Sequence, residues 1–207
     1  MGFREVVIYL SFIAGGFLLG SIPFCRVLPK LIKHVDVCAL SDDGNPGAAN
    51  AFKHCGVLVG SLCLLCDMLK GFLPAFFAYL IVGVNSVFYS FVMIAPVLGH
   101  ALGIFNDFAG GKCISTSFGV AAGTAFATWI GWILVGAYIL TAGILRLEHR
   151  LASIITFGFF GVSSVIVGII IGFPFVGIGF LLISITAIIK HLPKRKVEDT
   201  DDVSVPV

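Results

Sequence analysis

Long apolar runs separated by short polar segments dominate the sequence. A helix rises about 1.5 Å per residue, so about twenty apolar residues cross the ~30 Å hydrocarbon core of a bilayer. Apolar runs of this kind predict an all-α, polytopic membrane protein with spans at Val6–Arg26, Cys55–Val82, Ser86–Phe105, Leu151–Ile171, Phe173–Ile189 and two shorter ones within 113–145. Pro29–Lys53 and Asn106–Lys112 are expected to be polar loops.

Residues 113–145 decide the number of spans. This segment is too long for one ordinary crossing and long enough for two short ones, and Trp129 and Trp132 near its middle are typical of a turn at the bilayer surface. Seven spans then place ten basic residues on one side, namely Lys30, Lys33, Lys53, Lys112, Arg146, Arg150, Lys190, Lys194, Arg195 and Lys196, with only Arg4 opposite. Because positive charge is retained inside, the N-terminus is predicted outside and the C-terminus in the cytoplasm.

Composition agrees with this interpretation. Hydrophobic residues make up 58% of the chain and charged residues 12%, and the mean hydropathy is +1.09, which excludes an ordinary soluble protein. Of the six cysteines only Cys63 and Cys66 are close together, inside an apolar run, so we expect small hydrophobic side chains and no metal site. We expect one membrane domain at 1–191 and a basic, then acidic, disordered cytoplasmic tail at 192–207.

Two glycine-rich polar segments are the candidates for a binding site. Ser41–Lys53 reads SDDGNPGAANAFK, and Gly110–Lys112 directly precedes a predicted helix. Glycine lets a ligand approach the main chain closely, and the free N–H groups at a helix N-terminus favour phosphate. A short turn before a helix would also explain Gly-Gly-Lys alone, but both segments fall on the same predicted side. Together they predict a phosphate-binding site at one membrane surface.

Other polar residues have simpler explanations as well. His100 and His191 lie near predicted helix ends, where they can act as bases, as ligands or only as caps. Asp67 and Lys70 are three positions apart on one helix, so they are expected to neutralise each other as a structural pair.

Several motifs occur in the order found in a known enzyme family. They are GSIPF, DGNPGAAN, CDMLKG, GHALGIFNDFAGGKCIST, LASI and IIKH, and they extend from about residue 18 to residue 191. In these motifs the chain resembles the acyl-phosphate-dependent glycerol-3-phosphate acyltransferases of bacteria. The resemblance implies a seven-span inner-membrane enzyme with a cytoplasmic active site. It also implies acyl transfer from acyl phosphate to the 1-hydroxyl of glycerol 3-phosphate. Membrane lipids are then expected as partners, and neither a cofactor nor a nucleic acid is expected.

The resemblance also implies the residues of the site. It assigns catalysis to Asn45, Lys112 and His191. It assigns substrate binding to Asp43, Gly44, Gly47, Asn50, Lys53, His100, Gly110, Gly111, Arg150, Ser153 and Lys194.

The chain departs from the family pattern at several of these positions. Asp43, Ala49 and Lys53 replace Ser, Thr and Arg in the first loop; Gly103, Ala109 and Cys113 replace Pro, Lys and Gly in the second; Arg150 and Lys194 replace Ser and Asn. These changes leave open an enzyme with another acceptor, or a non-catalytic lipid-binding or transport protein. An acyl-CoA enzyme with a His-x4-Asp pair is excluded, because none of the five histidines has Asp five positions later.

Overall fold

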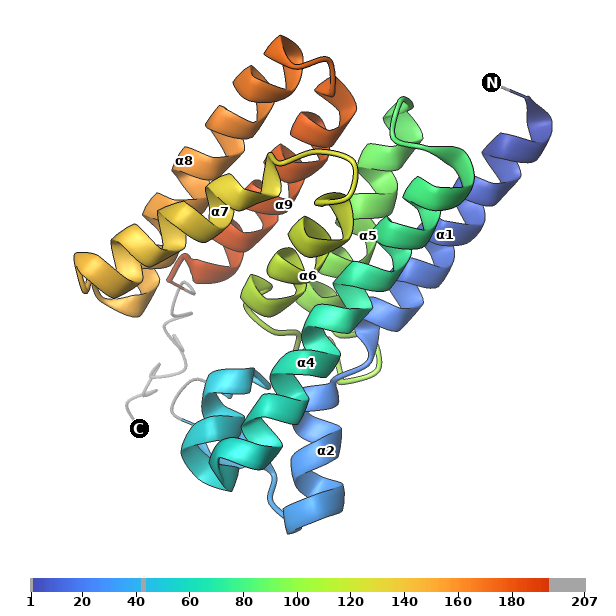
Figure 1. Cartoon of the computed structure of the whole chain (residues 1–207). Coiled ribbons are helices and arrows are strands. Elements are labelled where there is room, and N and C mark those ends of the chain that lie inside the picture. The colour runs from blue at the N-terminus through green and yellow to red at the C-terminus, as the bar shows by residue number, and fades with distance from the viewer. Residues whose placement is uncertain (1, 42–43, 194–207) are drawn as a thin grey trace, which may run out of the picture.

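The computed structural model describes residues 2–41 and 44–193, and within these ranges every regular element is a helix (Figure 1). This confirms the predicted all-α class. Asp43, Lys194 and nearly all of the predicted tail lie outside the described residues.

The first apolar run forms two helices instead of one. Helix α1 (Phe3–Ser21) ends before Pro23, and α2 (Phe24–Lys33) begins directly after it. Proline has no N–H to continue a helix, so the chain turns at Ile22–Pro23. The predicted single span at Val6–Arg26 was therefore wrong at its C-terminal end.

The predicted loop at Pro29–Lys53 was also wrong in extent. It contains the end of α2, the short helix α3 (Val37–Leu40) and the start of α4 (Ala48–Val82). Helix α4 breaks at Gly56, whose φ of 84° and ψ of 178° are not helical, so the predicted start at Cys55 marks this break.

The next three helices agree more closely with the apolar pattern. Helix α5 (Val87–Leu102) begins at the Ser86 cap and ends at Gly103, which is left-handed with φ 61°. Helix α6 (Ile114–Thr124) and helix α7 (Gly131–Tyr138), which continues as the π-helical turn η1 (Ile139–Ile144), divide the long run in two. Trp129 lies in the connection between α6 and α7, and Trp132 lies in the first turn of α7, so the run is divided near its predicted middle. That this turn lies at the bilayer surface stays a prediction.

The last two helices form an antiparallel pair. Helix α8 (His149–Ile170) is capped by Glu148, whose carboxylate accepts hydrogen bonds from the Arg150 and Leu151 amides. Helix α9 (Pro174–His191) returns along it (Figure 1).

Among the described residues, four helices are long and apolar enough to cross a membrane: α1, α4, α8 and α9. Helix α5 and the α7–η1 segment are apolar but shorter. With 11 residues, α6 covers only about half the thickness of the hydrocarbon core. The number of crossings therefore stays a prediction.

Glycines allow two helix pairs to pack unusually closely. A Cβ on Gly20 would lie 2.1 Å from the Pro96 carbonyl oxygen, and one on Gly99 would lie 2.1 Å from that of Phe17, so α1 and α5 meet backbone to backbone. In the same way, a Cβ on Gly119 of α6 would lie 2.0 Å from the Met68 oxygen of α4. Small residues are the usual means of such contacts in membrane proteins.

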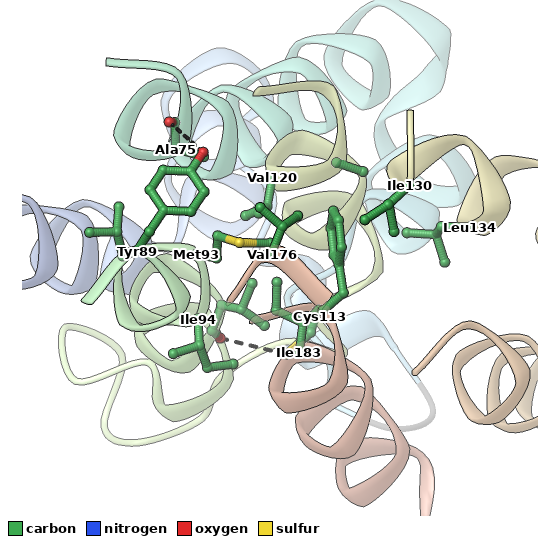
Figure 2. Close-up of a cluster of buried hydrophobic side chains, with 14 of the residues drawn as sticks. Ala75, Tyr89, Met93, Ile94, Cys113, Val120, Ile130, Leu134, Val176 and Ile183 are labelled. Atoms are coloured by element: carbon green, nitrogen blue, oxygen red, sulfur yellow. Dashed lines mark hydrogen bonds between the residues drawn. The ribbon is translucent and has the colours of Figure 1, made fainter. Parts of the chain in front are cut away.

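A continuous apolar core lies between these helices. Figure 2 shows Tyr89, Met93 and Val120 in this core, with Val176 and Ile183 contributed by α9. The Tyr89 hydroxyl donates a 2.9 Å hydrogen bond to the Ala75 carbonyl, which satisfies a fully buried polar group. The core joins α4, α5, α6 and α9 and so positions the end of α5 and the start of α6, between which the second polar segment lies.

Candidate functional site

The first polar segment is a tight turn around Asn45. Gly44 has a left-handed φ of 61°, and the Asn50 side chain donates a 2.9 Å hydrogen bond to the Asn45 carbonyl. The Asn45 amide lies over Gly47, where a Cβ would come within 2.8 Å of Nδ2. Gly47 is the N-cap of α4, so the turn presents Asn45 at a helix N-terminus.

The second segment packs tightly under the end of α5. The Gly111 N–H donates a 3.0 Å hydrogen bond to the His100 carbonyl, and a Cβ on Gly110 would lie 2.1 Å from the Ala101 oxygen. Cys113, the N-cap of α6, is left-handed with φ 69°. The two glycines are thus required by contact with α5, and Lys112, which follows them, is half-buried.

A polar cleft of about 370 Å³ opens where the two segments meet. Its basic side chains are Lys112, Arg150 and Lys190, and no acidic residue lines it in the described part of the chain. The complete lining is Gly44, Asn45, Phe108, Ala109, Gly110, Lys112, Arg150, Lys190, His191, Leu192 and Pro193. Its charge suits a phosphate group.

A larger and mostly apolar cleft of about 450 Å³ adjoins it, and Asn45 and Lys112 line both. Phe52, Leu64 and Phe118 are among its apolar residues. Its remaining lining is Asn45, Gly47, Ala48, Ala49, Asp67, Met68, His100, Lys112, Cys113, Ile114, Ser115, Tyr138 and His149. The arrangement can hold a molecule with an apolar chain and an anionic head.

His191 has one ring nitrogen fixed and one available. Its Nδ1 lies 2.7 Å from the Ala187 carbonyl oxygen, so this nitrogen must carry the proton. The Nε2 of the neutral ring is then an acceptor, and it is buried without a hydrogen-bond partner among the described residues. The ring meets that of His149 at a centroid distance of 5.9 Å, so the two histidines connect the walls of the two clefts.

Four predicted site residues line neither cleft: Asn50, Lys53, Ser153 and Gly111, which packs against the His100 ring. Ser153 is fully buried, and its hydroxyl donates a 2.8 Å hydrogen bond to the His149 carbonyl one turn earlier in α8, so it faces the protein interior and not a cleft. Lys53 is exposed and lines neither cleft. The Asn50 side chain stabilises the Asn45 turn by its hydrogen bond to the Asn45 carbonyl. Asp43 and Lys194 lie outside the described residues.

Sequence reasoning missed Lys190, which it treated only as part of a basic stub. Its Nζ donates a 2.9 Å hydrogen bond to the Ala101 carbonyl, which fixes the end of α9 to the end of α5 beside the polar cleft. Its position next to His191 at a helix C-terminus was the available signal.

Sequence reasoning also missed a contact that connects the two predicted polar loops, Pro29–Lys53 and Asn106–Lys112. Arg26 donates hydrogen bonds to Asp36, at 3.2 Å, and to Asn106 of the second loop. Lys30 adds a 3.1 Å ion pair to Asp36. Although burial raises the pKa of the Asp36 carboxyl, the hydrogen bonds from Arg26 and Lys30 lower it below its usual range. Arg26 could not be found because the sequence placed it inside the first span.

No group of three or more His, Cys, Asp or Glu side chains in the described ranges is arranged to hold a metal ion.

Comparisons with known proteins agree on one family. The model of the glycerol-3-phosphate acyltransferase family matches residues 10–196. Glycerol-3-phosphate acyltransferase 2 of Thermotoga maritima is 33% identical over 85% of both chains, and the enzyme of Aquifex aeolicus is 38% identical over 62% of this chain and 69% of that one.

Two solved structures have the same fold. They are crystal structures of PlsY (YgiH), an integral membrane glycerol 3-phosphate acyltransferase, in its lysophosphatidic acid and glycerol 3-phosphate forms. Both are 30% identical to this chain, with TM-scores of 0.74 and 0.73, and both cover 88% of it; the coverage of their own chains is 87% and 88%. The chain belongs to the glycerol-3-phosphate acyltransferase family.

Proposed function

We propose that the chain is a membrane acyltransferase that moves a fatty acyl group from acyl phosphate to the 1-hydroxyl of glycerol 3-phosphate. The products are lysophosphatidate and inorganic phosphate. The observation that carries the proposal is the pair of adjoining clefts, one basic and one mostly apolar, that share Asn45 and Lys112. An acyl phosphate has this same division between an apolar chain and an anionic head.

The acyl chain of the donor occupies the apolar cleft, along Phe52, Leu64 and Phe118. Removal of this chain from water is the main source of donor affinity, at ~0.8 kcal/mol per buried methylene. The phosphate then reaches the shared rim, where the Lys112 ammonium and the Asn45 amide donate hydrogen bonds to it.

The acceptor, glycerol 3-phosphate, occupies the polar cleft. The phosphate of glycerol 3-phosphate lies against Arg150 and Lys190, with the main chain at Gly110 close to it. Arginine contacts two phosphate oxygens at once, while lysine acts as a point charge. Binding roles for Asp43, Lys53 and Lys194 remain predictions.

His191 acts as the general base. Its available Nε2 accepts the proton of the acceptor hydroxyl as the hydroxyl oxygen forms a bond to the acyl carbon. The bond between that carbon and the phosphate oxygen then breaks, and phosphate leaves with the electron pair. Lys112 and Asn45 stabilise the negative charge that grows on the leaving phosphate and the carbonyl oxygen.

The site faces the cytoplasm in this proposal. Seven crossings of the inner membrane, with the N-terminus outside, place both clefts at the same face as Lys30, Lys33 and Arg146. The domain then ends near residue 191, and the rest is a cytoplasmic tail. Accessibility of single cysteines introduced at residues 2 and 146, in a variant in which the six native cysteines are replaced, tests this orientation in intact cells.

Purified protein in detergent tests the reaction. Palmitoyl phosphate is supplied with and without glycerol 3-phosphate, phosphate release is followed, and the lipid product is identified by mass spectrometry. We expect release to require both substrates and to match lysophosphatidate formation mole for mole. Release that is independent of glycerol 3-phosphate, or no release with either, contradicts the proposal.

A further inference from the structure

A buried ion pair lies behind the apolar cleft. Asp67 Oδ1 and Lys70 Nζ, one turn apart on α4, are separated by 2.7 Å, and their side chains are 2% and 1% exposed. Asp67 also lines the cleft, while Lys70 does not. A charged pair is costly to bury in a membrane protein, and such pairs commonly serve function as well as mutual neutralisation.

The pair is fixed from one side by the joint between α1 and α2. Lys70 Nζ donates a 3.1 Å hydrogen bond to the Ile22 carbonyl, at the break before Pro23. The Cys25 thiol donates a 3.1 Å hydrogen bond to Asp67 Oδ2. Asp67 is therefore held in one orientation, with Oδ1 on Lys70 and toward His100 of α5.

His100 of α5 lies between Asp67 and the second polar segment. Its side chain is 8% exposed, and its Nδ1 lies 4.0 Å from Asp67 Oδ1. The opposite edge of the ring presses on Gly111, where a Cβ would come within 2.2 Å of Nε2. The His100 carbonyl also accepts the Gly111 N–H at 3.0 Å, so both the ring and the main chain of His100 hold Gly111.

We propose that Asp67 is a positioning residue of the site, which acts through the His100 ring on Gly111 and so fixes the direction in which Lys112 faces the two clefts. A carboxylate on one edge of the ring limits its rotation, and the ring in turn limits the Gly110–Lys112 turn. The consequence for turnover rests on the proposed function, but the chain of contacts does not.

Hydrogen exchange measured by mass spectrometry in detergent tests the contacts without turnover. In Asp67→Asn, the exchange rate of the peptide that contains Gly110–Lys112 should rise about fivefold, as expected if the hydrogen bond from the Gly111 N–H to the His100 carbonyl weakens. The exchange of α9 peptides should remain unchanged. In a His100→Ala background the same Asp67→Asn change should add nothing further. Glu5→Gln, at the opposite end of the molecule, serves as the control and should alter neither peptide.

Asp67→Asn leaves Lys70 buried without its partner, so the variant could fail to fold. The double variant Asp67→Asn/Lys70→Met removes both charges at similar volume, a change that folded proteins often tolerate, and it should show the same local rise. Unchanged exchange at Gly110–Lys112 in folded protein overturns the proposal. An equal rise in α9 also overturns it, because the role is then global stability.

The kinetic arm separates this inference from the proposed function. With palmitoyl phosphate and glycerol 3-phosphate, kcat per folded enzyme should fall about tenfold or more in Asp67→Asn, since a misplaced catalytic group costs rate, while KM changes less than about twofold. A rise in KM with kcat unchanged contradicts positioning of Lys112. If wild type itself shows no turnover, the proposed function fails, and the exchange measurement still decides the role of Asp67.

Discussion

Asn45 and Lys112, which come from polar segments far apart in the sequence, line the same two clefts. The Asn45 turn precedes α4, and the Lys112 segment precedes α6, so both sit at helix N-termini at one end of the molecule (Figure 1). This relationship gives a donor with an apolar chain and an anionic head one continuous place to bind, with the reacting atoms at the shared rim.

The apolar cleft should set acyl-chain length. Leu64→Trp places a larger side chain in the cleft, so we expect kcat/KM for palmitoyl phosphate to fall about tenfold relative to octanoyl phosphate. Leu65→Trp is the matched control, because Leu65 is 53% exposed and lines neither cleft. An equal loss for both chain lengths would show that the cleft does not hold the chain.

Gly111 should tolerate no side chain. In Gly111→Ala the new methyl group would meet the His100 ring, so the segment must shift, and we expect kcat/KM to fall about 100-fold, the scale of a ~1 Å displacement in an active site. The control is Gly158→Ala on α8, where a Cβ meets nothing within 4 Å. That variant should keep its activity and gain about 0.5 kcal/mol or more of stability. Full activity in Gly111→Ala would show that close packing of Gly111 against the His100 ring is not needed for activity.

The Arg26–Asp36 contact should make stability depend on pH on the acid side. The folded-state pKa of Asp36 is lowered, so its contribution is present above the ordinary carboxyl pKa of 3.8 and is lost as the pH falls through the folded value. Asp36→Asn should therefore lower the thermal midpoint at pH 7, at a cost of about 1 kcal/mol. The gap to wild type should close below pH 3.8. A gap that is constant with pH would mean that the charge of Asp36 contributes nothing.

His191→Gln tests the general base. The amide cannot accept a proton, so kcat should fall about 100-fold or more while KM for glycerol 3-phosphate changes little. His191→Ala should be no better, because it also lacks a base. If instead KM rises and kcat is retained, His191 binds the acceptor and another group removes the proton.

Much of the fold could be predicted from the sequence, because apolar run length directly limits helix length. The division of residues 113–145 followed from length and from Trp129, and the structure has separate helices α6 and α7 there. The end of the first span was predicted at Arg26, which is too late, since a run of apolar residues does not show whether the helix continues beyond a proline. Arg26 was lost as a site-organising residue for this reason.

The candidate site was predictable where local chemistry defines it. The glycines of both polar segments indicated close main-chain contact, and the structure brings Asn45 and Lys112 together. Tertiary contacts could not be predicted in the same way. The sequence gives no sign that the Ser153 hydroxyl bonds within its own helix or that Lys190 reaches the Ala101 carbonyl.

The most direct measurement of the central claim is kcat/KM of Lys112→Ala with palmitoyl phosphate and glycerol 3-phosphate. Lys33→Ala is the control, an exposed lysine of α2 that lines neither cleft. We expect Lys112→Ala, and Asn45→Ala beside it, to lose about 100-fold or more, because a preorganised donor to the developing charge is missing, and Lys33→Ala to remain near wild type. If folded Lys112→Ala keeps wild-type kcat/KM, the shared rim of the two clefts is not where acyl transfer occurs.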